Sequence, residues 1–219
     1  MRLENGKSGQ LKGMIPVLIC FTALGAAAYI GLAERDGTEG VPPRGGGRGV
    51  AYAQTVSDTT ASADAFLKAS GVFLSPRCVN CHPLGDHPLR GEAGLPHRMN
   101  VKRGPDGMGK DGLWCSTCHQ TESLPGLGMP PGGPDWQLPP EDMPMSFEKQ
   151  TPRELCEHLK DPAQNGGRTP QEVVEHVQTA PLVLWGWDPG EGRTPVQMPH
   201  AEFVKLMTEW SQKGAACPQ

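Results

Sequence analysis

Two short cysteine–histidine motifs constrain this chain more than any other feature of its sequence. Both follow the pattern Cys-x-x-Cys-His, one at Cys78-Val79-Asn80-Cys81-His82 and the other at Cys115-Ser116-Thr117-Cys118-His119. In this pattern the two cysteines form thioether bonds to the vinyl groups of a c-type haem, and the adjacent histidine binds the iron. The sequence therefore predicts two covalently bound haem c groups, one at each motif.

A zinc site made of four cysteines is the main alternative, because it also uses pairs with this spacing. That interpretation gives no role to the histidine that directly follows each pair. A disulfide within each pair is the other alternative, and it has the same weakness. Covalent haem accounts for all four cysteines and both histidines of the two motifs.

The composition indicates a thin side-chain core that two haems would complete. Glycine and proline number 29 and 23 among 219 residues, which excludes a long regular helical bundle. Neither isoleucine nor tyrosine occurs after residue 60, although sheets favour β-branched and aromatic residues. We therefore expect a mainly α fold in which long Pro/Gly-rich loops wrap around two covalent haems.

Several helix boundaries can be predicted from local signals. Residues 151–154 and 169–172 have the sequence Thr-Pro-x-Glu, a capping box with proline at the first helical position. A last helix is expected from His200 to about Lys213, ending at Gly214. The folded part is expected to begin with a short helix near Ala61.

The N-terminal region has the pattern of a membrane anchor. Residues 14–33 carry no charge, and as a helix they would span about 30 Å, the thickness of the hydrocarbon core of a bilayer. Arg2, Lys7 and Lys12 precede this run, which places the N-terminus in the cytoplasm and the remainder outside it. We expect residues 1–33 to form an N-terminal membrane anchor, with one transmembrane helix at 14–33 in a bacterial inner membrane and the soluble domain in the periplasm. A cleavable signal peptide ending near Ala33 is the alternative.

The chain after the anchor divides into two further parts. Residues 34–60 include a stretch rich in proline, glycine and arginine at 42–49, and we expect them to form a flexible tether. Residues 61–219 contain both motifs and are expected to form the dihaem cytochrome c domain.

Five histidines outside the motifs are candidates for the second axial position of each iron. They are His87, His97, His158, His176 and His200. His97 lies between the two motifs and follows a proline that restricts its backbone. His176 lies on the helix expected after Thr169, beside a row of valines. We predict that His97 and His176 are the two ligands and keep the other three in reserve.

Methionine is an alternative ligand that would raise the haem potential. Met99 lies two residues after His97, and Met143 and Met145 flank a proline. The residues alone leave His/His and His/Met ligation open.

Two cysteines, Cys156 and Cys217, belong to neither motif. In an oxidising compartment a disulfide between them would close a separation of 61 residues, 217 minus 156, and tie the first C-terminal helix to the tail. The alternative is a pair of free thiols.

The segment Gly-Arg-Thr-Pro occurs twice, at residues 167–170 and 192–195. Four matching residues are too few to indicate a duplication. We interpret the repeat as coincidence or as a shared way of starting a helix.

With these motifs the chain resembles small dihaem c-type cytochromes of bacterial respiratory and oxidative chains. Its C-terminal part also resembles the family labelled "isoquinoline 1-oxidoreductase subunit", through Leu155-Cys156, Asn165-Gly166-Gly167-Arg168 and Leu184-Trp185-Gly186-Trp187. The similarity runs from about residue 70 to the end. The resemblance implies a protein that accepts electrons from a molybdenum hydroxylase. The chain itself has no molybdopterin-binding motif, so we apply only the cytochrome function of that family to it.

These observations lead to one functional hypothesis and two alternatives. The formal net charge of −4 argues against nucleic-acid binding and suits a basic patch on a redox protein partner. We expect a membrane-tethered periplasmic cytochrome that transfers electrons between redox partners. A peroxidase-like dihaem enzyme would need one open iron, which five spare histidines disfavour. A cytochrome subunit of a larger oxidoreductase complex is the second alternative.

Overall fold

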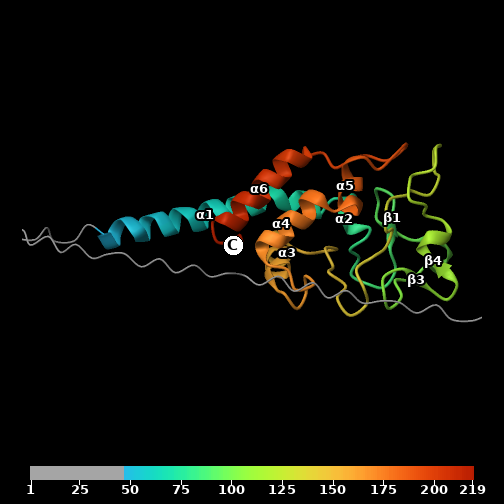
Figure 1. Cartoon of the computed structure of the whole chain (residues 1–219), viewed down its shortest axis with the longest axis horizontal. Coiled ribbons are helices and arrows are strands. Elements are labelled where there is room, and N and C mark those ends of the chain that lie inside the picture. Colours follow the sequence, from blue (N-terminus) through green and yellow to red (C-terminus); the bar gives the residue numbers. More distant parts are fainter. Residues whose placement is uncertain (1–46) are drawn as a thin grey trace, which may run out of the picture. The chain divides into compact units, whose positions relative to one another are not determined.

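The described part of the chain is mainly helical, with long loops between the helices (Figure 1). The computed structural model describes residues 47–219, so the expected anchor, residues 1–33, and the tether up to residue 46 lie outside the described residues. Among residues 47–219, no helix is both long and apolar enough to cross a membrane. The expectation of a mainly α fold with long loops is confirmed for this part of the chain.

The first helix begins earlier than the sequence predicts. Helix α1 spans Gly47–Phe73, so residues 47–60 are helical, and the prediction of a flexible tether was wrong for them. Residues 50–60 contain neither proline nor glycine, so no residue in this stretch interrupts the helix. The hydroxyls of Thr55 and Thr59 donate to the carbonyls four residues earlier, at 2.8 and 2.9 Å, and so add bonds along the helix.

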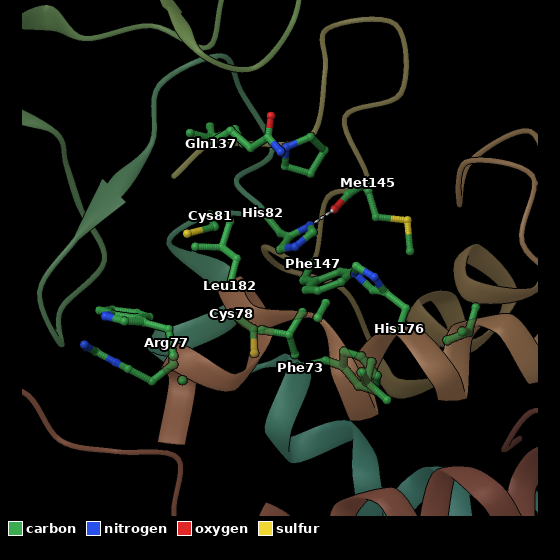
Figure 2. A pocket seen from close by; sticks show the side chains of 18 of the residues that line it. Phe73, Arg77, Cys78, Cys81, His82, Gln137, Met145, Phe147, His176 and Leu182 are labelled. Carbon is green, nitrogen blue, oxygen red and sulfur yellow. Dashed lines mark hydrogen bonds between the residues drawn. The ribbon is translucent and has the colours of Figure 1, made fainter. Parts of the chain in front are cut away.

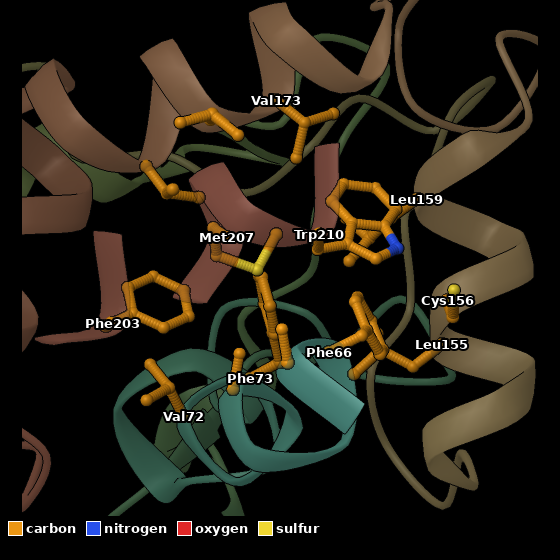
Figure 3. Packing of buried hydrophobic residues seen from close by; sticks show 14 of the residues in the cluster. Phe66, Val72, Phe73, Leu155, Cys156, Leu159, Val173, Phe203, Met207 and Trp210 are labelled. Atoms are coloured by element: carbon orange, nitrogen blue, oxygen red, sulfur yellow. The ribbon is translucent and has the colours of Figure 1, made fainter. Parts of the chain in front are cut away.

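Four helices enclose the apolar core. The second half of α1 packs against α6 (His200–Gln212) and α3 (Pro152–Lys160), and α1 lies alongside α6 (Figure 1). Helix α4 (Pro170–Thr179) packs against α6 and α3. Aromatic rings dominate the contact (Figure 3): Phe66 lies 5.3 Å from Trp210 between ring centroids, and Phe73 lies 5.2 Å from Phe203. Each such ring contributes about 1.5–3 kcal/mol through burial, so this cluster fixes the helices that flank the first motif.

The local signals placed the C-terminal helices correctly. Thr151 and Thr169 each accept a hydrogen bond from the backbone N–H of the glutamate three residues later, and that glutamate accepts one from the threonine N–H. Both capping boxes are therefore confirmed. Helix α6 begins at His200, as predicted, and the chain leaves it at Gly214, whose φ of +96° suits glycine.

Cys156 and Cys217 form a disulfide with an S–S distance of 2.04 Å and a Cα–Cα distance of 5.6 Å. It joins α3 to the C-terminal tail, as proposed from the sequence. The buried hydroxyl of Ser62 on α1 holds the same tail, because it accepts a hydrogen bond of 2.9 Å from the backbone N–H of Ala216.

The remaining elements are short and lie around the two motifs. They are α2 (Pro76–Val79), α5 (Pro181–Leu184), the hairpin β1–β2 (Leu89–Arg90 with Leu95–Pro96), the hairpin β3–β4 (Gly109–Lys110 with Leu113–Trp114) and 3₁₀ turns at Arg98–Asn100, Cys115–Thr117 and Trp185–Trp187. Helix α2 runs into the first motif, and β4 runs directly into the second.

Candidate haem sites

The two motifs adopt the same backbone turn. In the first motif (residues 78–82), the N–H groups of Cys81 and His82 both donate to the carbonyl of Cys78, each at 3.1 Å. In the second motif (residues 115–119), the N–H groups at the matching positions donate to the carbonyl of Cys115 at 3.2 and 2.9 Å. In both motifs the histidine thus follows one turn after the first cysteine. The four cysteines are free, in contrast to the bonded pair at 156 and 217.

His82, the histidine of the first motif, is held by a backbone carbonyl and an aromatic ring. Its Nδ1 lies 2.7 Å from the carbonyl oxygen of Met145 (Figure 2), and its ring stacks on Phe147 with centroids 4.0 Å apart. Because a carbonyl only accepts, Nδ1 must carry the proton, and Nε2 keeps a lone pair for a metal. Burial lowers the pKa of His82 to about 4, so the ring is neutral at pH 7.

His119, in the second motif, has the same two supports from a different loop. Its Nδ1 donates to the carbonyl of Pro131 at 2.7 Å, and its ring lies parallel to Trp136, 4.7 Å between centroids with 4° between planes. Burial also lowers the pKa of His119. Both motif histidines are therefore neutral and orientated with Nε2 as the available ligand atom.

The first motif lines a cavity of about 400 Å³. His176 extends from α4 toward the same space (Figure 2), and burial lowers its pKa, with the nearby charge of Arg168 as the second cause. The wall is largely apolar and includes Val72, Phe73, Leu138, Leu159, Val173, Val177 and Phe203. Two neutral imidazoles that line one apolar space of this size suit an apolar disc such as a porphyrin.

The other candidate ligands separate into two groups at this cavity. The side chains of Met143 and Met145 also line it, so the methionine alternative stays open here. His87, His158 and His200 are absent from its lining. His200 is engaged elsewhere, because its Nε2 lies 3.0 Å from the carbonyl of Val177.

His97 faces His119 at the second motif. The hairpin β1–β2 ends directly before His97, and the two imidazole centroids lie 6.1 Å apart. The Nδ1 of His97 lies 2.8 Å from the carbonyl of Arg98, so Nε2 is again the free nitrogen. A metal bonded at about 2 Å to one nitrogen of each of two imidazoles would hold their centroids roughly 6 Å apart. The spacing thus fits one iron between the two rings.

The second site is more open than the first. Eight large apolar side chains between residues 84 and 129 are exposed: Leu84, Leu95, Met99, Met108, Trp114, Leu124, Leu127 and Met129. Met99, the methionine closest in sequence to His97, is 68% exposed. Seven of the eight lie between residues 95 and 129, on the segments before and after the second motif.

The thiols of the first motif are strongly desolvated. Burial raises the pKa of Cys78 to about 11 and that of Cys81 to about 12. Burial also raises the pKa of Cys115, at the second motif. All three are therefore protonated thiols at neutral pH. Among the described residues, no three His, Cys, Asp or Glu side chains are grouped so that they could hold one metal ion.

The structure assigns each predicted distal histidine to one motif, which the sequence did not do. His176 shares the first site with His82, and His97 shares the second with His119. The supporting residue Phe147 was missed, because an aromatic residue in a Pro/Gly-rich loop has no local pattern that identifies its partner.

Comparisons of the chain with protein-family models, with curated proteins and with solved structures each returned no match. The assignment of the two sites therefore depends on the residues and their geometry.

Proposed function

We propose that this protein is a dihaem c-type cytochrome that transfers electrons between redox partners. The observation that carries the proposal is the repetition of one arrangement at two places. Each motif histidine donates from Nδ1 to a backbone carbonyl and stacks on an aromatic ring, and a second histidine shares its site.

The cysteines would attach the two haems covalently. Each attachment would add a cysteine S–H across a vinyl double bond, with the sulfur going to one vinyl carbon and the hydrogen to the other. Cys78 and Cys81 would hold one haem, and Cys115 and Cys118 the other. The bound haem supplies an iron that changes by one electron between its ferric and ferrous states.

Two nitrogen ligands at each iron favour electron transfer over bond chemistry at the metal. His82 with His176, and His119 with His97, would each hold one iron through two imidazole nitrogens, which would leave no ligand position for peroxide. The apolar wall of the first cavity would keep water from an iron bound there and would so influence its potential. A peroxidase-like enzyme would instead require one of the two distal histidines to be unbound.

We further propose that the protein is anchored in a bacterial inner membrane with residues 47–219 in the periplasm. The uncharged run at 14–33, preceded by basic residues, supports the anchor. The disulfide between Cys156 and Cys217 supports an oxidising compartment. The periplasmic location and the acidic net charge suit a redox protein as the partner. That partner can be part of a larger oxidoreductase complex.

Intact mass tests the cofactor assignment. The full chain is produced in a bacterial host with haem c maturation machinery, and the expected mass exceeds that of the polypeptide by two haem groups. Cys78→Ala with Cys81→Ala should lower this excess to one haem, and Cys115→Ala with Cys118→Ala should do the same. A bare polypeptide mass for the wild type would contradict the proposal.

A further inference from the structure

The two Gly-Arg-Thr-Pro segments, residues 167–170 and 192–195, share a backbone feature that helix formation does not explain. Thr169 caps α4, but no helix follows Pro195 until α6 begins at His200. The interpretation as a shared way of starting a helix was therefore wrong for the second segment. In both segments the glycine before the arginine has a positive φ, +79° at Gly167 and +76° at Gly192. Only glycine adopts this conformation freely, so each segment turns sharply at its arginine.

Arg168, in the first segment, lies at the first haem site. It lines the same cavity of about 400 Å³ as His82 and His176, and its charge contributes to the lowered pKa of His176. The loop that carries it is firmly built. Asn165, 2% exposed, donates from Nδ2 to the carbonyl of Arg168 at 2.7 Å and accepts from the N–H of Arg168 at 2.7 Å.

Arg193, in the second segment, lies at the second haem site. Its Nη2 donates to the carbonyl of Met129, two residues before Pro131, whose carbonyl orients His119. Its charge contributes to the lowered pKa of His119. Burial lowers the pKa of Arg193 itself, and the charge of Arg77 lowers it further. The guanidinium of Arg77 therefore lies near that of Arg193.

Neither arginine forms an ion pair in the part of the chain that the structure describes, although the charge of Arg168 contributes to the lowered pKa of the exposed Glu172. The side-chain hydrogen bonds of Arg168 and Arg193 go to backbone carbonyls. Both side chains are half-buried. A half-buried guanidinium favours an anionic partner, and its planar fork matches a carboxylate at two points.

We propose that Arg168 and Arg193 each bind a propionate carboxylate of the haem at their own site. This inference rests on the proposed function, since the porphyrin of haem c carries two propionates. It explains why one four-residue segment occurs twice in a chain with two haem motifs. Each segment places one guanidinium beside one iron-binding histidine.

Resonance Raman spectra of the holoprotein test this proposal through the bending band of the haem propionates. Arg168→Gln and Arg193→Gln should each shift this band for one haem while the mass still shows two. The midpoint potential of that haem should fall, because losing a positive charge beside the iron favours the ferric state. Arg168→Lys should have a midpoint potential close to that of the wild type, because it keeps the positive charge. Its propionate band should still be shifted, because an ammonium lacks the planar fork that binds a carboxylate at two points.

The matched control is Arg153→Gln, an exposed arginine on α3 that does not line the first cavity. This variant should change neither the propionate band nor the midpoint potential of either haem. If Arg168→Gln yields no folded holoprotein, Arg168→Lys takes its place: a shifted propionate band supports the proposal, and an unshifted band overturns it. Unshifted propionate bands in both glutamine variants would overturn the proposal, as would an equal shift in the control. The intact mass of each sample is measured first, to verify that two haems are bound. A missing haem mass would contradict the proposed function, whereas an unshifted Raman band in a protein with two haems would contradict only this inference.

Discussion

The imidazole centroids of His97 and His119 lie 6.1 Å apart, with 57° between the ring planes. The two residues follow different hairpins, β1–β2 and β3–β4, so the approach results from the tertiary arrangement of the loops. His176 and His82 share the cavity of the first site in a similar way. We infer that each pair binds one iron, and the following predictions depend on these pairs and on the elements that hold them.

Removing one distal histidine should change one haem and leave the other unchanged. His97→Ala and His176→Ala should each convert a single haem from low spin to high spin, and its reduced iron should then bind carbon monoxide. The haem itself stays attached through its cysteines. His87→Ala serves as the control, because His87 does not line the first cavity. If both alanine variants keep two low-spin haems, the ligand assignment fails and the methionines must be tested.

The N-cap of α4 should influence the first haem, because α4 carries His176. Thr169→Ala removes the cap and should cost about 1 kcal/mol of the free energy of unfolding. It should also increase the high-spin fraction of one haem in the optical spectrum. Thr151→Ala removes the equivalent cap of α3, which carries no predicted ligand. Equal high-spin fractions in the two variants would show that α4 does not position a ligand.

The capping carboxylates should make stability fall in acid. Hydrogen bonds from the backbone and hydroxyl of Thr169 lower the pKa of Glu172 below its ordinary value of 4.5, and Thr151 acts likewise on Glu154. The folded state therefore binds protons less tightly at these groups than the unfolded state. Their contribution is fully present above pH 4.5 and is lost as the pH falls through the lower, folded-state pKa.

Urea denaturation of the holoprotein at a series of pH values measures this effect. Glu154→Gln with Glu172→Gln should have a flatter dependence than the wild type below pH 4.5. An unchanged slope in the double variant would assign the acid sensitivity to other groups.

The disulfide should stabilise the domain without affecting ligation of either haem. Cys156→Ser with Cys217→Ser opens a loop with a sequence separation of 61, and the expected loss is about 4 kcal/mol in the chain-entropy account. The ultraviolet–visible spectrum of both haems should stay low-spin. The measurement compares the denaturation midpoints of three samples: the wild type with its disulfide intact, the wild type with its disulfide reduced, and the double variant. A variant as stable as the oxidised wild type would contradict the prediction.

The N-terminal region should be separable from the haem sites. A chain that lacks residues 1–33 and carries a cleavable signal peptide should yield a soluble holoprotein with an unchanged spectrum. Cell fractionation should place the full chain in the membrane. Failure of the shortened chain to acquire haem would show that residues 1–33 contribute to assembly of the domain.

Local chemistry explains which parts of the fold could be predicted from the sequence. The capping boxes at Thr151 and Thr169 and the end of α6 at Gly214 each depend on a few adjacent residues. Helix α1 was placed too late, because the Pro/Gly-rich stretch was extended to residue 60 in the prediction, whereas that composition ends at Gly49.

Long-range relationships explain what could not be predicted at the sites. The carbonyl that orients His82 belongs to Met145, 63 residues away, and a backbone carbonyl has no signature in the sequence. The arginines at 168 and 193 were visible only as a short repeat. Their position beside His176 and His119 depends on how the loops fold over the motifs.

Low-temperature electron paramagnetic resonance of the fully oxidised holoprotein tests the central claim most directly. The account predicts two low-spin ferric signals, each integrating to one haem per chain, because every iron has two nitrogen ligands. The reduced protein should accordingly fail to bind carbon monoxide. A high-spin ferric signal that integrates to one haem per chain, together with turnover of peroxide, would contradict the account and indicate an enzyme with an open iron.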